Sequence, residues 1–181
     1  MTISSADLSE LIGQCRKGSN RAQMSLYHIY SPRVFGSALS ILKDKQEAED
    51  AMQEAFLKAF TKMDTYSASA PFESWLRRIV INEAITVYRK RKARRYIPVE
   101  ETPPSDDRLR TPSAIEKMMV FDKVSQALAR LKENYRLALT LFLIEEYNYR
   151  EISQCMDISY ANSRTLVSRA KQELRNELAK L

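Results

Sequence analysis

The 181-residue chain is predicted to be an all-α protein with two small helical domains, joined by a flexible linker, and a helix-turn-helix in the second domain. Three observations predict this class. The chain has only three glycines and little of the Val/Ile alternation that is typical of strands. Apolar residues recur instead at helical spacing, and prolines gather in one short stretch. We expect the domains at residues 1–96 and 113–181, with the linker at 97–112.

Five helices are expected in the first domain, near residues 5–17, 20–30, 32–43, 46–63 and 72–92. Pro32 has no backbone N–H and is expected to kink or divide the second helical stretch. The clearest amphipathic segment is 46–63, whose apolar positions form one stripe and predict a core face. The stripe consists of Ala48, Met52, Ala55, Phe56, Ala59, Phe60 and Met63.

Acidic and amide side chains occupy the remaining surface of this fourth helix. They are Glu49, Asp50, Gln53 and Glu54. The residues alone allow two interpretations, a plain solvated surface or a docking face for a partner. The net charge of the chain is +6, and its acids and cations are segregated along the sequence, which suggests two faces for two partners.

The fifth helix, 72–92, is apolar on more than one side, which indicates burial in a bundle. A further stripe, with residues spaced alternately by four and three, contains both apolar and polar side chains. We call it the mixed stripe; it suits contact with both the flat face and the polar edge of a base. It consists of Trp75, Ile79, Asn82, Thr86 and Arg89. Asn82 is either such a contact, because an amide offers both a donor and an acceptor, or a buried amide satisfied by backbone.

The end of this helix is strongly basic, with Arg89, Lys90, Arg91, Lys92, Arg94 and Arg95. Such a cluster favours a polyanion as partner, because cations that neutralise phosphates release condensed counterions. Aromatic residues lie nearby in the sequence, at Tyr66, Phe72, Trp75 and Tyr88. If exposed, they would allow single-stranded bases to stack. The alternative is that the aromatics are core and the cations a solvated helix end.

The second domain is predicted to begin with a helix near 113–130, capped by Ser113 and Glu116, followed by one near 132–146. A short helix to Met156 then has a capping box of Asn148 and Glu151, and Ser159 can cap a last helix from Tyr160 to about Lys180. A short helix, a tight turn and a longer basic helix form the pattern of a helix-turn-helix. A plain helical hairpin is the alternative.

Little in the sequence suggests catalysis. There is one histidine, no glycine-rich phosphate loop, and no cysteine spacing typical of a metal site or disulfide framework. We therefore expect no catalytic residues, no metal and no cofactor. The sequence shows neither an apolar signal segment nor a run long enough to span a membrane, so we expect a soluble cytoplasmic protein without membrane insertion.

Three segments together resemble a bacterial RNA polymerase sigma factor of the extracytoplasmic-function type, group 4 of the sigma-70 family. AEDAMQEAFLKAF, Ala48 to Phe60, is similar to the region 2.2 helix that binds the β′ clamp of the polymerase. The segment from Phe72 to Arg94 resembles regions 2.3 and 2.4, which melt and recognise the minus-ten element. Tyr149 to Leu174 resembles the region 4.2 helix-turn-helix that recognises the minus-thirty-five element.

The resemblance implies roles for the matching positions. Core polymerase would be bound by Glu49, Asp50, Gln53 and Glu54. Minus-ten DNA would be contacted by Tyr66, Trp75, Ile79, Asn82, Arg89 and Arg91. Within that set, Tyr66, Ile79 and Asn82 would line a pocket for a flipped base, and Trp75 would hold the preceding loop against the helix. Minus-thirty-five DNA would be contacted by Ser159, Tyr160, Asn162, Arg164, Thr165, Ser168, Arg169 and Lys171.

The implied partners are core RNA polymerase through its β′ clamp and β flap, promoter DNA in duplex and melted form, and a separate anti-sigma factor. The chain departs from the family pattern at four positions. Glu146 replaces a glycine before the helix-turn-helix, so we expect that helix to end without the left-handed conformation that glycine adopts. Ala161 also replaces a common glycine, and Ser163 and Leu166 occupy positions that are usually apolar and basic, which suggests local repacking.

Two rival functions remain at this stage. A stand-alone transcriptional regulator would use only the helix-turn-helix and bind duplex DNA without polymerase. An adaptor would bind a protein partner through its helical N-terminal domain and make no sequence-specific DNA contact. A nucleic-acid enzyme is disfavoured, because no catalytic constellation is present.

Overall fold

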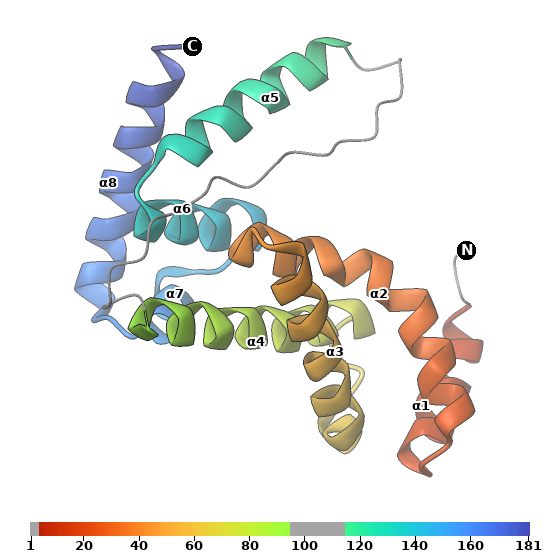
Figure 1. Cartoon of the computed structure of the whole chain (residues 1–181). Helices are drawn as coiled ribbons and strands as arrows, with labels where there is room; N and C mark the ends of the chain where they lie inside the picture. The colour runs from red at the N-terminus through yellow and green to blue at the C-terminus, as the bar shows by residue number, and fades with distance from the viewer. Residues whose placement is uncertain (1–3, 95–114) are drawn as a thin grey trace. The chain divides into compact units, whose positions relative to one another are not determined.

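The computed structural model describes residues 4–94 and 115–181, and each range forms its own compact unit of helices (Figure 1). These residues contain helices and no strands, which confirms the all-α class. The linker expected at 97–112 and the helix cap expected at Ser113 lie outside the described residues.

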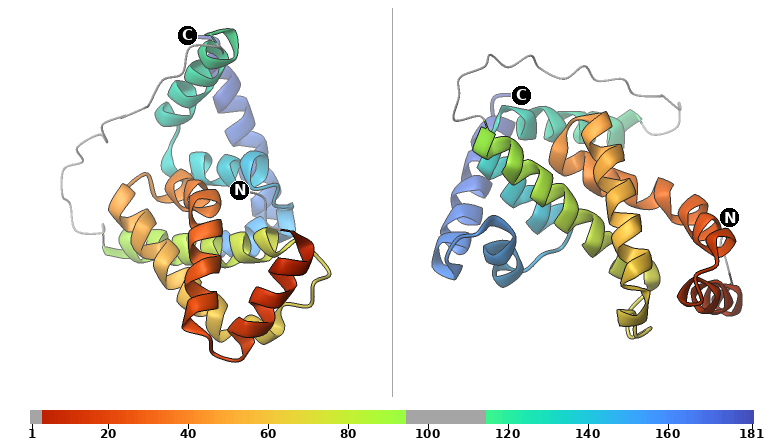
Figure 2. Two further views of the ribbon diagram at one scale, coloured as in Figure 1. Left: turned by 90° about the vertical axis from the view of Figure 1, so that its right-hand side faces the viewer. Right: turned by 60° about the horizontal axis from the view of Figure 1, so that its bottom comes forward.

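The first unit comprises α1 (Ser5–Arg16), α2 (Asn20–Leu42), α3 (Lys45–Thr61), the short 3-10 helix η1 (Met63–Thr65) and α4 (Phe72–Arg94). Helices α2, α3 and α4 pack on one another, and α1 packs on α2 and η1 (Figure 2). Side chains begin the first three helices by accepting a backbone N–H of the first turn, an N-cap that stabilises each helix by about 1 kcal/mol. These caps are Ser4, Ser19 and Asp44.

The apolar stripe predicted on α3 is the buried face of that helix. Ala48, Ala55 and Ala59 are completely buried, Phe56 is nearly so, and Phe60 is half-buried; Met63, also buried, lies beyond the end of α3 in η1. Small alanine side chains let the backbones of neighbouring helices approach closely, and α3 makes many of its contacts with α4. The opposite face of α3 is thereby directed to solvent.

The prediction that Pro32 separates two helices is wrong, because α2 runs unbroken through it. Proline inside a helix removes one hydrogen bond and costs about 3 kcal/mol or more. Packing on both sides of Pro32 offsets that cost: Leu26 and Tyr30 before it, and Val34 and Ala38 after it, are all buried in the unit's core. Each fully buried Leu or Val contributes about 1.5–3 kcal/mol.

The second unit comprises α5 (Ile115–Arg130), α6 (Glu133–Leu139), the π-helical turn η2 (Thr140–Ile144), α7 (Tyr149–Met156) and α8 (Tyr160–Leu178). Leu131, Leu139 and Ala170 form a buried cluster against which Leu128 and Leu174 pack. Helix α8 contacts α5, α6 and α7, so it connects this core to the short helix beside it (Figure 2).

The helix-turn-helix forms with the two caps that the sequence predicts. The Asn148 side chain accepts the N–H groups of Arg150 and Glu151, and the Glu151 carboxylate accepts the N–H of Asn148 at 2.9 Å. Ser159 accepts the N–H of Asn162 at 3.1 Å and begins α8. Between them Asp157 ends α7 in the left-handed conformation, with φ 54°.

The prediction for Glu146 is wrong in an informative way. We expected the helix before α7 to end without a left-handed residue, yet Glu146 has φ 58°. The chain reverses there, and the N–H of Tyr147 donates to the carbonyl of Leu141 at 2.9 Å. Glu146 therefore adopts the backbone conformation that favours glycine, which costs a residue with a Cβ roughly 1–2 kcal/mol.

Replacement of this residue by glycine, Glu146→Gly, is expected to stabilise the chain by about 0.5–1 kcal/mol. The gain is smaller than the relief of the left-handed strain, because glycine also loses more backbone entropy on folding. Urea unfolding of the full chain measures it. Glu146→Ala keeps the Cβ and serves as control; if both variants unfold at the same urea concentration, the left-handed strain is not the cause.

Candidate functional site

Helix α3 presents the first predicted surface. Glu49, Asp50, Gln53 and Glu54 are all exposed, on the side opposite the buried alanines. We call these four residues the acidic face. Leu57 extends it by one helical turn and is 61% exposed. The sequence interpretation missed Leu57, although its spacing of seven residues from Asp50 assigns it to this face.

Lys58 connects the edge of the acidic face to α4. Its ammonium donates a hydrogen bond to the Glu83 carboxylate and lies 3.7 Å from that of Glu54. The hydrogen bond with Glu83 is the main cause of a raised pKa for Lys58. Among the described residues, no cation forms an ion pair with Glu49 or Asp50, the other two acids of this face.

Helix α4 carries the second predicted surface. Its mixed stripe begins with Trp75 and Ile79, which are half-buried, and continues with Asn82, Thr86 and Arg89, which are exposed. The Thr86 hydroxyl donates to the backbone carbonyl of Asn82 at 2.8 Å. Because the side chain of Asn82 is exposed, the alternative of a buried structural amide is excluded.

Of the two alternatives left open for the four aromatics, exposure or burial in the core, the structure shows burial for three. Phe72, Tyr66 and Tyr88 are 2%, 9% and 5% exposed. The Tyr66 ring packs against those of Phe72 and Trp75, with centroids 5.3 and 5.4 Å away, and its hydroxyl donates to the Ala70 carbonyl at 3.0 Å. Tyr66 therefore shapes the loop before α4 and offers little face for stacking. Trp75 packs this loop against the helix, as expected.

Arg91, which is predicted to contact DNA, also makes contacts within the first unit. Its guanidinium donates to the Leu42 carbonyl at 3.0 Å and to the Glu47 carboxylate at 2.9 Å. It thus joins the end of α4 to the junction between α2 and α3. The contact crosses 44 residues of sequence, so the local basic cluster gives no sign of it. Of the remaining cations of the described cluster, Arg89, Lys90 and Lys92 are exposed.

The third predicted surface is an open hollow of about 630 Å³ along the first half of α8. It brings together four predicted residues, and it adds Tyr149 and Ala161, which the sequence analysis did not assign to DNA. Its predicted members are Arg164, Thr165, Ser168 and Arg169. The departure from glycine at Ala161 thus falls inside this surface.

The other residues predicted for this surface lie around the hollow. Ser159 is engaged as the helix cap, and Tyr160 and Asn162 are exposed at the start of α8. Lys171 differs: its ammonium lies 3.9 Å from the centroid of the Phe142 ring, which itself stacks on Tyr149. A cation held over a ring in this way stabilises the packing of α8 on η2 as well as carrying charge.

Ser163 is one of the two positions at which the sequence suggests local repacking. It is completely buried, and its hydroxyl lies 2.8 Å from the carbonyl oxygens of Tyr149 and Tyr160. The bond to Tyr149 ties α8 to the first turn of α7, which fixes the two helices relative to each other. A buried hydroxyl with such a partner replaces an apolar contact at little cost.

No helix of the described residues has the length and apolar character needed to cross a membrane. Within the same residues, no three His, Cys, Asp or Glu side chains gather as the ligands of a metal ion would.

Two family models and several known proteins match the chain. Residues 26–94 match the model of Sigma-70 region 2, and residues 121–174 match that of Sigma-70, region 4. The ECF RNA polymerase sigma factor SigM of Bacillus subtilis is 33% identical over 156 residues, 83% of this chain and 91% of that protein. SigW of the same organism is 26% identical, covering 96% of this chain and 98% of its own.

Among solved structures, the sigma factor RpoE in complex with the anti-sigma factor NepR from Bartonella quintana shares the fold. Its TM-score is 0.55 at 21% identity, with 86% of this chain and 96% of that chain covered. The chain belongs to the ECF sigma factors of the sigma-70 family, alternative sigma factors that direct promoter recognition and transcription initiation.

Proposed function

We propose that the two units divide the work of promoter recognition. The first unit, within residues 1–96, binds core RNA polymerase and recognises and melts the minus-ten element. The second, within residues 113–181, recognises the minus-thirty-five element. The observation that carries this proposal is that three exposed polar surfaces lie on α3, α4 and α8, each opposite a buried apolar face of its own helix.

The acidic face is proposed to bind the β′ clamp. Glu49 and Asp50 supply negative charge, and the exposed Leu57 supplies an apolar contact at its edge. This combination suits a protein interface, in which a desolvated apolar contact gives affinity and charges give orientation. In the second unit, Leu143 and Ile144 are 52% and 54% exposed, and they are proposed to contact the β flap.

The mixed stripe of α4 is proposed to recognise the melted minus-ten strand. Asn82 would hydrogen-bond a base edge, Ile79 and Trp75 would supply the apolar wall, and Arg89 would meet the phosphates. Extrusion of a base costs a few kcal/mol, and stacking returns about 1–3 kcal/mol per base. The near balance means that polymerase contacts can complete melting without ATP hydrolysis. The polymerase, not this chain, performs the chemistry.

We propose that the first half of α8, with its hollow, enters the major groove of the minus-thirty-five element. Arg164 and Arg169 provide donors that fit guanine or phosphate, and Thr165 and Ser168 are short enough for close approach of the helix. Tyr149 forms the side of the hollow contributed by α7.

Arg164→Ala is expected to weaken binding to the upstream element by about 1–3 kcal/mol, because a bidentate contact to a base edge would be lost. Competition binding with duplexes changed at single positions measures it. Discrimination between bases should fall at one position of the upstream element only. Arg175→Ala, on α8 beyond the hollow, is the control. A loss that is uniform over all sequences would instead assign Arg164 to a phosphate.

Regulation by an anti-sigma factor is proposed from the relatives. The sigma factor RpoE, solved in complex with the anti-sigma factor NepR, shares this fold, as does CnrH, solved in complex with the cytosolic domain of CnrY. We propose a separate protein that covers one of the exposed surfaces of this chain, and a cytoplasmic location where polymerase is available.

The test of the proposed function is to map transcript 5′ ends made on genomic DNA by sigma-free core polymerase, with and without this protein. New start sites with a shared two-part upstream motif would support it. Folded protein with active core from the same organism and no new start sites would contradict it. Tight sequence-specific duplex binding in that case would favour the stand-alone regulator.

A further inference from the structure

The loop from Tyr66 to Pro71, between η1 and α4, has a defined shape although most of it is exposed. At its end, the Tyr66 hydroxyl donates to the Ala70 carbonyl at 3.0 Å. In its middle, the hydroxyls of Ser67 and Ser69 lie 2.9 Å apart. Ala68 between them has φ 58°, a left-handed conformation that an alanine adopts only when the surrounding contacts hold it.

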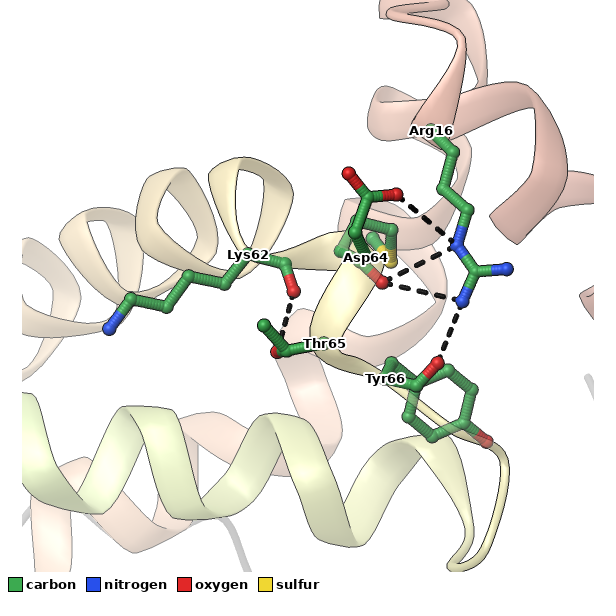
Figure 3. A network of polar contacts seen from close by, with 6 residues as sticks. Arg16, Lys62, Asp64, Thr65 and Tyr66 are labelled. Carbon is green, nitrogen blue, oxygen red and sulfur yellow. Dashed lines mark hydrogen bonds and ion pairs between the residues drawn. The ribbon is translucent and has the colours of Figure 1, made fainter.

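The start of this loop is held by a residue from another helix, Arg16 in the last turn of α1 (Figure 3). Its guanidinium donates to the carbonyl of Tyr66 at 2.7 Å and, at 3.5 Å, to that of Met63. Its Nε also lies 3.7 Å from the carboxylate of Asp64. One planar group thus meets three acceptors around η1, which a lysine ammonium would meet less well.

Two features distinguish this contact from a simple packing interaction. Two of the three acceptors are main-chain carbonyls, so the guanidinium fixes the path of the backbone rather than one side chain. Helix α1 is also anchored independently, because Ile12 and Cys15 are 6% and 4% exposed. Arg16 therefore holds the start of the loop in place relative to α1, and α1 is itself held in place by its buried side chains.

The loop precedes the mixed stripe directly. The carbonyl of Pro71 accepts the N–H groups of Ser74 and Trp75 at the start of α4, and the Tyr66 and Trp75 rings are in contact. A displacement of the loop start would thus move the exposed groups of Ser67 to Ala70 relative to Trp75 and Ile79. These are the groups nearest in sequence to the proposed base-binding wall of α4.

We propose that Arg16 is a positioning residue for minus-ten specificity: from α1 it sets the shape of the 66–71 loop, and through that shape the base preference of the melted strand. This inference rests on the proposed function of the α4 stripe. Arg16 lies outside residues 26–94, the range that matches Sigma-70 region 2. Its effect is on which base is accepted, not on the affinity for polymerase.

The experiment compares Arg16→Gln, Arg16→Lys and the control Arg21→Gln in transcription from a library of promoters randomised in the minus-ten element. Arg21 is an exposed arginine on α2, so its change removes the same charge nearby. Affinity for core polymerase and the thermal unfolding temperature are measured for each variant. For Arg16→Gln we expect at least a fivefold loss of base discrimination at one minus-ten position, with core affinity within twofold of the parent. Arg16→Lys should recover part of the discrimination, and Arg21→Gln should keep it.

A fall in transcription by the same factor on every promoter, with unchanged base preference, would overturn the inference and leave Arg16 as a stabilising contact. If Arg16→Gln does not fold, Tyr66→Phe removes the other contact that holds the loop, the hydrogen bond to Ala70, and must lower base discrimination at one minus-ten position. Unchanged preference in Tyr66→Phe would then overturn it. If the parent protein itself starts no transcripts at a shared motif, the proposed function fails, and this inference with it.

Discussion

Asp50→Arg is expected to weaken binding of this sigma factor to core RNA polymerase roughly 30- to 1000-fold, about 2–4 kcal/mol. Asp50 is exposed at the centre of the acidic face, two turns before Leu57 on the same side of α3. A reversed charge there loses an attraction and adds repulsion from a cationic partner surface. Titration of fluorescently labelled protein with core polymerase measures the change.

The matched control for this charge reversal is Glu10→Arg, on the exposed side of α1, where the carboxylate accepts a hydrogen bond from the side-chain amide of Gln14. It changes the net charge by the same amount and should leave core affinity within about twofold. Equal losses in both variants would assign the effect to net charge. An unchanged affinity in Asp50→Arg would remove the acidic face from the polymerase interface.

Local sequence patterns predicted the helices well, because most have a periodic apolar face and five of the described helices begin with a side-chain cap. The capping box of Asn148 and Glu151 and the cap at Ser159 are confirmed atom by atom. Pro32 shows the limit of such local reasoning. The chemistry of proline gives the cost of placing it inside a helix, but the burial of Tyr30 and Val34 that offsets this cost depends on α3 and α4, which no local pattern reveals.

The same limit applies to Glu146. A residue type predicts its preferred conformation, but the chain reversal before α7 requires a left-handed residue there whatever its side chain. Packing of η2 and α7 on either side fixes the reversal, so the strain stays with the residue.

Exposed surfaces were predicted better than their internal contacts. Helical periodicity is enough to assign Arg164 to solvent, because the opposite positions of its helix are apolar, whereas it left Asn82 open between an exposed and a buried amide. Arg91 and Arg16 could not be assigned in this way. Each bonds to a carbonyl more than 40 residues away, so the sequence shows a cation but not its partner. The sequence likewise shows that Tyr66 could stack on a base, but not that the rings of Phe72 and Trp75 bury it.

Asn82→Ala is expected to lower open-complex formation about 5- to 100-fold while core affinity stays within about twofold. The amide is exposed on the mixed stripe, and its loss removes one hydrogen bond to a base, with a discrimination of about 1–3 kcal/mol. Alanine is also a better helix former than asparagine, so α4 should lose no stability. A fluorescent base analogue in the minus-ten element, which brightens when it unstacks, measures promoter opening.

The outcome of this variant distinguishes recognition from folding, because the two surfaces of the first unit lie on different helices. Asn176→Ala is the control and should open promoters normally, because it removes an exposed amide on α8 whose side-chain oxygen accepts a hydrogen bond from Gln172. A loss of opening with intact core binding requires that α4 acts after polymerase has been bound through α3. If Asn82→Ala lowered promoter opening and core binding by the same factor, α4 would be misfolded in this variant. Normal opening by Asn82→Ala would move base recognition away from this stripe and leave the 66–71 loop as the remaining candidate.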